Sequence, residues 1–221
     1  MIIWPDRPIR CHCWQTLISK VSTGLLLLAV PAASADVFVR DDIITAPTYN
    51  HFSICYEHTC QQVVTRSLSQ QEWLEITVPL SAPLPTAGAE RAAIAVTVGN
   101  METAVGQLTG TGQDKGGNLA GFGLPGQMDC IDESTNTTTY LRMLVDNGLL
   151  KHHTVLDRAT RFGLFAGAPH TTAVIRETGT GQRFAVDSWF FDNGHAPAII
   201  TLRQWKSGWE PDEDVGENMH E

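Results

Sequence analysis

Two β-rich runs around a Gly-x-Gly turn constrain the fold more than any other feature of this chain. Residues 170–177 (HTTAVIRE) and 182–190 (QRFAVDSWF) are rich in β-branched and aromatic side chains, and residues 178–181 (TGTG) separate them. Runs of this composition on either side of a glycine-containing turn predict an antiparallel β-hairpin.

The length of the turn decides which residues of the hairpin face each other. A turn of two or of four residues makes the numbers of opposed residues sum to 359, so that His170 lies opposite Trp189. Because side chains two apart share a face, Asp187 becomes the diagonal neighbour of His170 on that face. Such neighbours are about 7–8 Å apart, within reach of a carboxylate–imidazole hydrogen bond. A turn of odd length without a bulge would separate them.

A helix is predicted to begin at Cys130 and to run to about residue 146. Asp129 can act as its N-cap, acidic residues occupy the first turn, and Gly148 provides a stop. Cys130 then lies in the first turn, where unpaired backbone N–H groups favour the thiolate. We therefore expect the pKa of Cys130 to lie below its usual value of about 8.5.

Two acidic residues near Cys130 act against a low thiol pKa. Asp132 and Glu133 oppose the thiolate, which is why a cationic histidine partner is needed.

Gln127 lies just upstream of Cys130. It could donate to an oxyanion together with the Cys130 N–H, or it is a solvated loop amide.

The first half of the mature chain predicts extended segments followed by a helix. Residues 37–39, 51–55 and 73–78 are short β-type runs, and residues 87–105 are rich in alanine. Gly99 weakens that helix by about 1 kcal/mol relative to alanine. Together with the hairpin and the helix at Cys130, these segments predict an α+β fold.

Phosphate and metal binding find little support in the sequence. The glycine-rich residues 109–127 lack the order Gly-x-x-x-x-Gly-Lys-Ser/Thr and follow no strand, so we expect a loop bordering the site. The eight histidines include no His-Glu-x-x-His spacing and the cysteines no Cys-x-x-Cys spacing, so we expect no metal and no cofactor.

The N-terminus has the pattern of a signal peptide. Residues 1–35 combine a basic beginning, the apolar residues 24–30 and the small-residue cleavage site Ala33-Ser34-Ala35. An uncleaved N-terminal anchor is the alternative, although the apolar run is shorter than the roughly 20 residues that span a bilayer. Cleavage would leave a single domain of ordinary size at residues 36–209, and the acidic residues 210–221 would form a solvated tail.

The negative net charge of the mature protein limits the kinds of partner that it can bind. Removal of three basic residues and one acid with the signal peptide changes the formal net charge from −9 to −11. So acidic a chain is not expected to bind nucleic acid through its phosphates. Since no further apolar run approaches membrane length, we expect no stable membrane insertion after cleavage, and a periplasmic or secreted bacterial protein.

Three cysteines remain after residue 35. In an exported protein Cys55 and Cys60 are expected to form a disulfide, which leaves Cys130 as an odd thiol. An odd thiol is either a nucleophile or an inert residue packed as a small hydrophobe.

A cysteine at a helix start, a histidine heading a strand and an aspartate on the next strand resemble the catalytic core of the transglutaminase-like, papain-type superfamily. The resemblance covers residues 126–209. It implies Cys130 as nucleophile, His170 as general base and acid, and Asp187 as the residue that orients the imidazole. The chain departs from the family in having no tryptophan after Cys130 and a threonine after His170.

Acyl transfer at amide bonds is the chemistry that this triad implies. For an exported enzyme the expected substrates are proteins or peptides, including peptidoglycan peptides. A binding module that retains the fold without activity, or a structural envelope protein, are the alternatives, because a fold alone does not confer activity.

Overall fold

The computed structural model describes residues 40–118, 121, 123–164 and 168–212. The predicted signal peptide at 1–35, the β-type run at 37–39 and tail residues 213–221 lie outside the described residues. The elements are β1 (Phe52–Tyr56), β2 (Gln62–Arg66), α1 (Gln70–Ile76), the 3₁₀ turn η1 (Val78–Leu80), α2 (Ala87–Thr109), α3 (Cys130–Asp146), β3 (His153–Leu164), β4 (Ala168–Glu177), β5 (Arg183–Asp187), β6 (Ala198–Thr201) and α4 (Leu202–Lys206).

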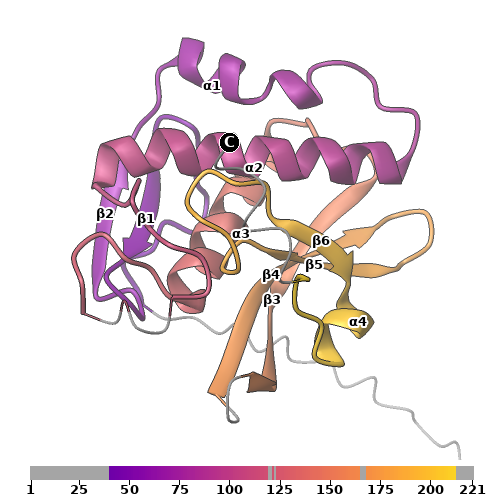
Figure 1. Ribbon diagram of the computed structural model, residues 1–221. Coiled ribbons are helices and arrows are strands. Elements are labelled where there is room, and N and C mark those ends of the chain that lie inside the picture. Colours follow the sequence, from indigo (N-terminus) through magenta and orange to yellow (C-terminus); the bar gives the residue numbers. More distant parts are fainter. Residues whose placement is uncertain (1–39, 119–120, 122, 165–167, 213–221) are drawn as a thin grey trace, which may run out of the picture. The chain divides into compact units, whose positions relative to one another are not determined.

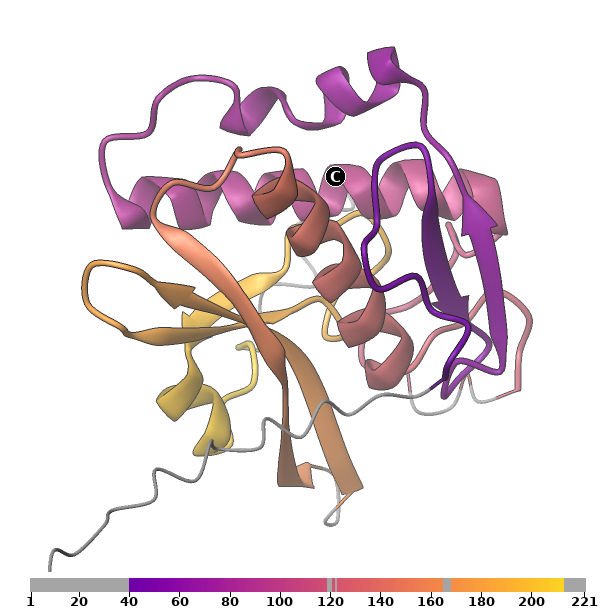
Figure 2. The same ribbon diagram turned by 180° about the vertical axis from the view of Figure 1, so that it is seen from behind.

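The described residues form two antiparallel sheets, and the α+β class is confirmed. β1 and β2 form a hairpin, and the second sheet has the strand order β3-β4-β5-β6. Seen from behind, α3 passes between the β1–β2 hairpin and the four-stranded sheet (Figure 2). α1 lies along α2 on the side away from that sheet (Figure 1).

Alternate residues of β4 pack against different helices. Ala173 and Ile175 belong to the main core, which also contains Leu141 and Leu144 of α3. Val174, between them, packs with Leu202 and Trp205 of α4 in a second cluster. One face of the sheet is therefore covered by α3 and the other by α4, as expected for a strand whose side chains alternate.

The predicted hairpin register is confirmed. Ala173 pairs with Val186 and Arg176 with Arg183, so opposed numbers sum to 359. The turn closes through Gly181, whose φ of +72° lies in the left-handed region that glycine enters at little cost.

The predicted helix at Cys130 is also confirmed. Asp129 caps α3 by accepting from the N–H groups of Ile131 and Asp132, and the Asp132 side chain accepts from the Asp129 N–H in return. This reciprocal arrangement is a capping box and satisfies N–H groups that have no partner within the helix. Gly148, with φ of +67°, follows the helix end.

The β-type run predicted at 73–78 is wrong, because that segment contains α1 and η1. Ser69 and Glu72 form a capping box at the start of α1. Trp73 and Ile76, three residues apart, are its buried side chains, which is helical spacing. A short run of large apolar residues fits either periodicity, and here the cap decides between them.

Gly99 lies inside α2 at a point where another backbone segment packs directly against the helix. A Cβ on Gly99 would lie 2.7 Å from the carbonyl oxygen of Gly194 and 3.1 Å from the carbonyl carbon of His195. The segment after β5 therefore approaches the α2 backbone more closely than any side chain allows, which offsets the helix-weakening effect of glycine.

We expect Gly99→Ala to destabilise the protein by about 1–3 kcal/mol, because backbone atoms block the new methyl group. The matched control is Gly88→Ala, whose Cβ would meet nothing closer than the flexible Arg91 side chain at 3.7 Å. That variant should be neutral or stabilising by up to about 1 kcal/mol. Urea denaturation measures both, and equal stability of the two variants would contradict the packing argument.

Candidate functional site

The hairpin register brings His170 and Asp187 together. His170 Nε2 lies 2.7 Å from Asp187 Oδ2 in a buried hydrogen bond. The same carboxylate oxygen accepts a hydrogen bond from Trp205 Nε1 of α4 at 2.6 Å. Asp187 is thus fixed from two sides, and it holds the imidazole by one nitrogen.

Aromatic rings enclose the His170 side chain, which has no exposed surface. The ring centroids of Trp189, Phe190 and Trp205 lie 4.9, 5.2 and 5.5 Å from that of His170. Exclusion of water strengthens the hydrogen bond to Asp187. The second nitrogen, Nδ1, is buried and makes no hydrogen bond to any described residue.

Cys130 occupies the first position of α3, and the turn at residues 57–60 is bound to the same helix end. Thr59 N donates to Asp129 Oδ2 at 2.9 Å, and His58 N and Cys60 N donate to Asp132 at 2.7 Å each. The four residues Glu57–Cys60 all have positive φ values, between 52° and 62°. Such left-handed backbone is costly for non-glycine residues, and the two carboxylates offset that cost by binding its N–H groups.

The expectation of a lowered Cys130 pKa is wrong. Burial raises the pKa of the thiol to about 12, and the charges of Asp129 and Asp187 act in the same direction. The backbone N–H of Thr171 opposes this by hydrogen bonding to the sulfur. Desolvation outweighs the helix terminus, so the resting thiol is neutral near pH 7.

The sulfur of Cys130 therefore meets β4 at the peptide that joins His170 to Thr171. His170 itself shares the face of Val174 and α4, while Thr171 shares the face of Ala173 and α3. No hydrogen bond joins Cys130 Sγ to His170 Nδ1 among the described residues. The structure thus joins His170 to Asp187 and brings the thiol of Cys130 to the backbone N–H of Thr171, the residue after His170.

The Gln127 side chain is held within the loop before α3. Its Oε1 accepts from Asn118 Nδ2 at 2.7 Å and from Lys115 N at 3.2 Å, and its Nε2 donates to Gln113 O at 2.9 Å. These contacts organise the loop, so we do not assign Gln127 an oxyanion role.

Cys55 and Cys60 lie within disulfide-bonding distance, with their Cα atoms 4.8 Å apart. With Asp132 they also form the one cluster of three potential metal ligands found among the described residues. Both Asp132 oxygens already accept backbone hydrogen bonds and a disulfide removes both thiolates, so these residues do not fit a metal ion.

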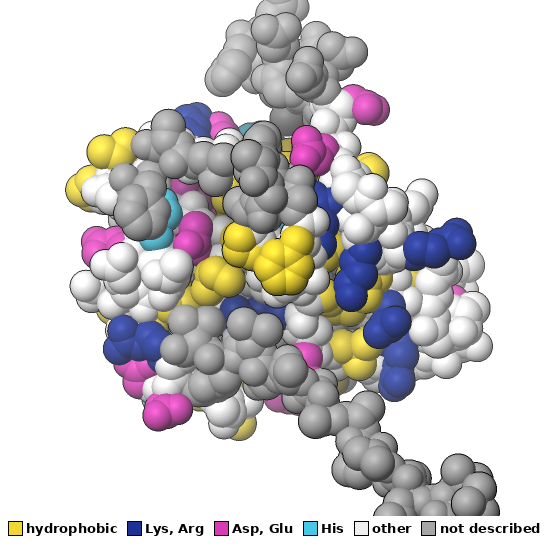
Figure 3. Space-filling view, turned by 90° about the horizontal axis from the view of Figure 1, so that it is seen from below, with side chains coloured by type: hydrophobic (Ala, Val, Ile, Leu, Met, Phe, Trp, Pro, Cys, Tyr) yellow, Lys and Arg dark blue, Asp and Glu magenta, His cyan; other side chains and the backbone are white. Residues whose placement is uncertain are grey.

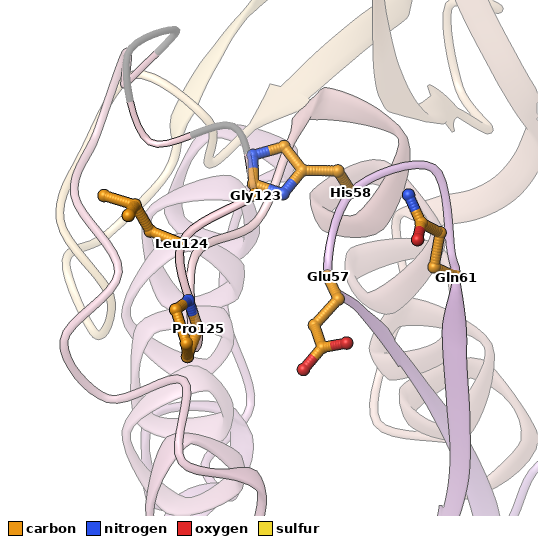
Figure 4. Close-up of a pocket in the computed structure, with 6 residues that line it drawn as sticks. All are labelled: Glu57, His58, Gln61, Gly123, Leu124 and Pro125. Carbon is orange, nitrogen blue, oxygen red and sulfur yellow. The ribbon is translucent and has the colours of Figure 1, made fainter.

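A pocket of about 260 Å³ opens between the two loops that flank the start of α3. Figure 4 shows Glu57, His58 and Gln61 on one side of it and Gly123, Leu124 and Pro125 on the other. The pocket therefore borders the helix end that carries Cys130, although Cys130 is not part of its lining.

The sequence interpretation missed a set of buried carboxyl groups close to the site. Glu102 of α2, Glu133 of α3 and Asp114 of the glycine-rich loop are all buried. Burial raises the pKa of Glu102 to about 7 and that of Asp114 to about 6, and it raises the pKa of Glu133 well above its usual range. No feature of the sequence indicates that these three carboxyl groups are buried together, because their positions depend on packing between α2, α3 and the loop.

Comparison with known proteins identifies no relative: no family model, no curated protein and no solved structure matches this chain. Within the described residues, no helix has the length and apolar character needed to cross a membrane.

The buried carboxyl groups predict how stability depends on pH. A carboxyl group with a raised pKa in the folded state binds its proton more tightly than in the unfolded state. Its stabilising effect is present below about pH 4.5 and is lost as pH rises to about 7 for Glu102. We expect the wild-type melting temperature to fall between pH 5 and pH 8, and to fall less in Glu102→Gln, whose amide cannot ionise.

The difference between wild type and Glu102→Gln should amount to a few kcal/mol at pH 8, because one pKa unit corresponds to about 1.4 kcal/mol. Glu75→Gln, at an exposed position of α1, is the matched control and should leave the pH profile unchanged. Parallel profiles for wild type and Glu102→Gln would show that Glu102 does not ionise in this range.

Proposed function

We propose that the protein is an exported cysteine-dependent enzyme that transfers acyl groups from amide bonds. Cys130 is the nucleophile, His170 the general base and acid, and Asp187 the residue that orients the imidazole. The observation that carries this proposal is the buried His170–Asp187 hydrogen bond, which leaves Nδ1 as the one nitrogen able to exchange a proton. A transglutaminase-like, papain-type core, with the cysteine helix packed on the sheet of the other two residues, is the fold that we propose.

The reaction begins from a neutral thiol. As the sulfur of Cys130 attacks the carbonyl carbon, its proton passes to His170 Nδ1, and Asp187 stabilises the resulting imidazolium. The imidazolium then protonates the leaving amine, the carbon–nitrogen bond breaks, and a thioester on Cys130 remains. Water, or a second amine, attacks the thioester after giving a proton to His170, and the thiol is restored.

Two structural features favour this chemistry. The N-terminus of α3, where the Cys130 N–H lies, carries a partial positive charge that would stabilise the oxyanion. The aromatic enclosure of His170 keeps water from the proton-transfer path. The proposed substrates are proteins or peptides, including peptidoglycan peptides.

The high thiol pKa supports a second candidate, a non-catalytic binding or structural envelope module that retains the fold. A neutral, half-buried cysteine with no hydrogen bond to histidine among the described residues is also what an inert thiol would show. Acylation of Cys130 distinguishes the two functions.

The test uses p-nitrophenyl acetate as a general acyl donor, with mass spectrometry of the peptide that contains Cys130. Wild type should release nitrophenolate and carry an acetyl group on Cys130, and Cys130→Ala should release none by this route. His170→Ala should acylate about 10²–10⁴-fold more slowly, the usual contribution of general base catalysis. Asp187→Asn should be milder than His170→Ala, although the same change costs about 10⁴-fold in a serine protease triad.

Residues that act as one unit have non-additive effects, so the variant with both His170→Ala and Asp187→Asn should be barely slower than His170→Ala. His51→Ala, which removes an exposed histidine, is the control and should acylate at the wild-type rate. Cys130 acetylated equally fast in wild type and His170→Ala would leave the binding or structural module as the function.

A further inference from the structure

Arg161 lies opposite His170 on the neighbouring strand and is almost completely buried. The two residues are register partners of β3 and β4, and Arg161 has 5% of its surface exposed. Opposed residues share a face of the sheet, with Cβ atoms about 4.5–5.5 Å apart. The Arg161 side chain therefore lies on the same face of the sheet as His170, the proposed general base.

Within the described part of the chain, only one end of this guanidinium is hydrogen-bonded. Nη1 donates to the carbonyl oxygen of Trp205, and to that of Trp209 at 2.8 Å. Nε and Nη2 are buried and have no hydrogen-bond partner among the residues that the structure describes. Their N–H groups form the side-on edge of the guanidinium, which matches the two oxygens of a carboxylate.

Unpaired donors of a buried cation are costly, since burial removes water without supplying a substitute. The immediate surroundings do not supply one. Trp205 and Phe190 lie against the guanidinium, with ring centroids 4.7 and 6.0 Å from its central carbon. Burial lowers the pKa of Arg161, and the charges of Asp187 and Glu210 act against that effect without bonding to it.

We propose that the open edge of Arg161 binds a free carboxylate of the substrate, so that the enzyme acts on amide bonds next to a terminal carboxyl group. This inference rests on the proposed function and specifies its substrate class. The Arg161 guanidinium and the His170 ring lie against the same two aromatic side chains, Phe190 and Trp205, so a carboxylate on the Nε–Nη2 edge would bind on the same face of the sheet as His170. The C-terminal residue of a peptide has this arrangement of carboxylate and amide.

One face of the molecule carries a group of basic side chains. Although the chain is acidic overall, lysine and arginine side chains gather along one side of the face shown in Figure 3, beside exposed hydrophobic side chains. Such a gathering raises the local concentration of anions. Phe190 and Trp209, which contact Arg161, are only half-buried. A ligand would therefore reach the Nε–Nη2 edge of Arg161 by moving these side chains, without a change in the backbone.

The test measures binding without turnover. Cys130→Ala protein is titrated with N-acetylalanine, and with N-acetylalaninamide as the probe that lacks only the carboxylate, while intrinsic tryptophan fluorescence is followed. N-acetylalanine should produce a saturable change and the amide should not. With Arg161→Gln added the change should disappear, and with Arg161→Lys binding should weaken at least about tenfold, because an ammonium cannot form the bidentate pair.

Arg203→Gln, which removes an exposed arginine of α4, is the matched control and should bind like its parent. If Arg161 only anchors α4, neither probe will bind saturably, or both will bind alike, and the inference is overturned. The titration of Cys130→Ala protein decides this even if Arg161→Gln does not fold. Cys130 acylation without carboxylate binding would overturn this inference alone, whereas carboxylate binding without acylation would overturn the proposed catalysis and leave a carboxylate-binding module.

Discussion

The hydrogen bond between His170 and Asp187 is the interaction on which the site depends, and the register of one hairpin produces it. A shift of one residue between β4 and β5 would move Asp187 to the face covered by α3 and leave the imidazole without a partner. Trp205 of α4 binds the same carboxylate oxygen, so the short C-terminal helix is part of the arrangement. The hairpin register and the packing of α4 against Val174 therefore both determine which nitrogen of His170 is bonded to Asp187.

The thiol is positioned by different means. Asp129 and Asp132 cap α3 and also bind the left-handed turn at Glu57–Cys60, so these two carboxylates join the β1–β2 hairpin to the helix that carries Cys130. This proximity of negative charge has a consequence for the chemistry. The charge of Asp129, together with that of Asp187, adds to burial in raising the thiol pKa to about 12, which makes the reactivity of Cys130 depend on a proton acceptor.

Local signals in the sequence predicted the parts of the structure that local rules determine. The turn length fixed the hairpin register, and Asp129 and Gly148 marked the ends of α3. Prediction was wrong where the outcome depends on partners distant in sequence. The helical conformation within residues 73–78 and the effect of burial on the Cys130 thiol are of this kind. The open edge of Arg161 and the buried Glu102 likewise could not be inferred, since nothing in the sequence indicates which charged residues are buried.

The most direct test of the account is the pH dependence of Cys130 alkylation by iodoacetamide in wild type and His170→Ala, followed on the peptide that contains Cys130. A thiol with a pKa of about 12 has a thiolate fraction of only about 10⁻⁵ at pH 7, so fast alkylation there requires a proton acceptor. The account predicts measurable wild-type alkylation near pH 7 and loss of that component in His170→Ala, whose rate should rise only at strongly alkaline pH. The same alkaline profile in both proteins would contradict the claim that His170 activates this thiol.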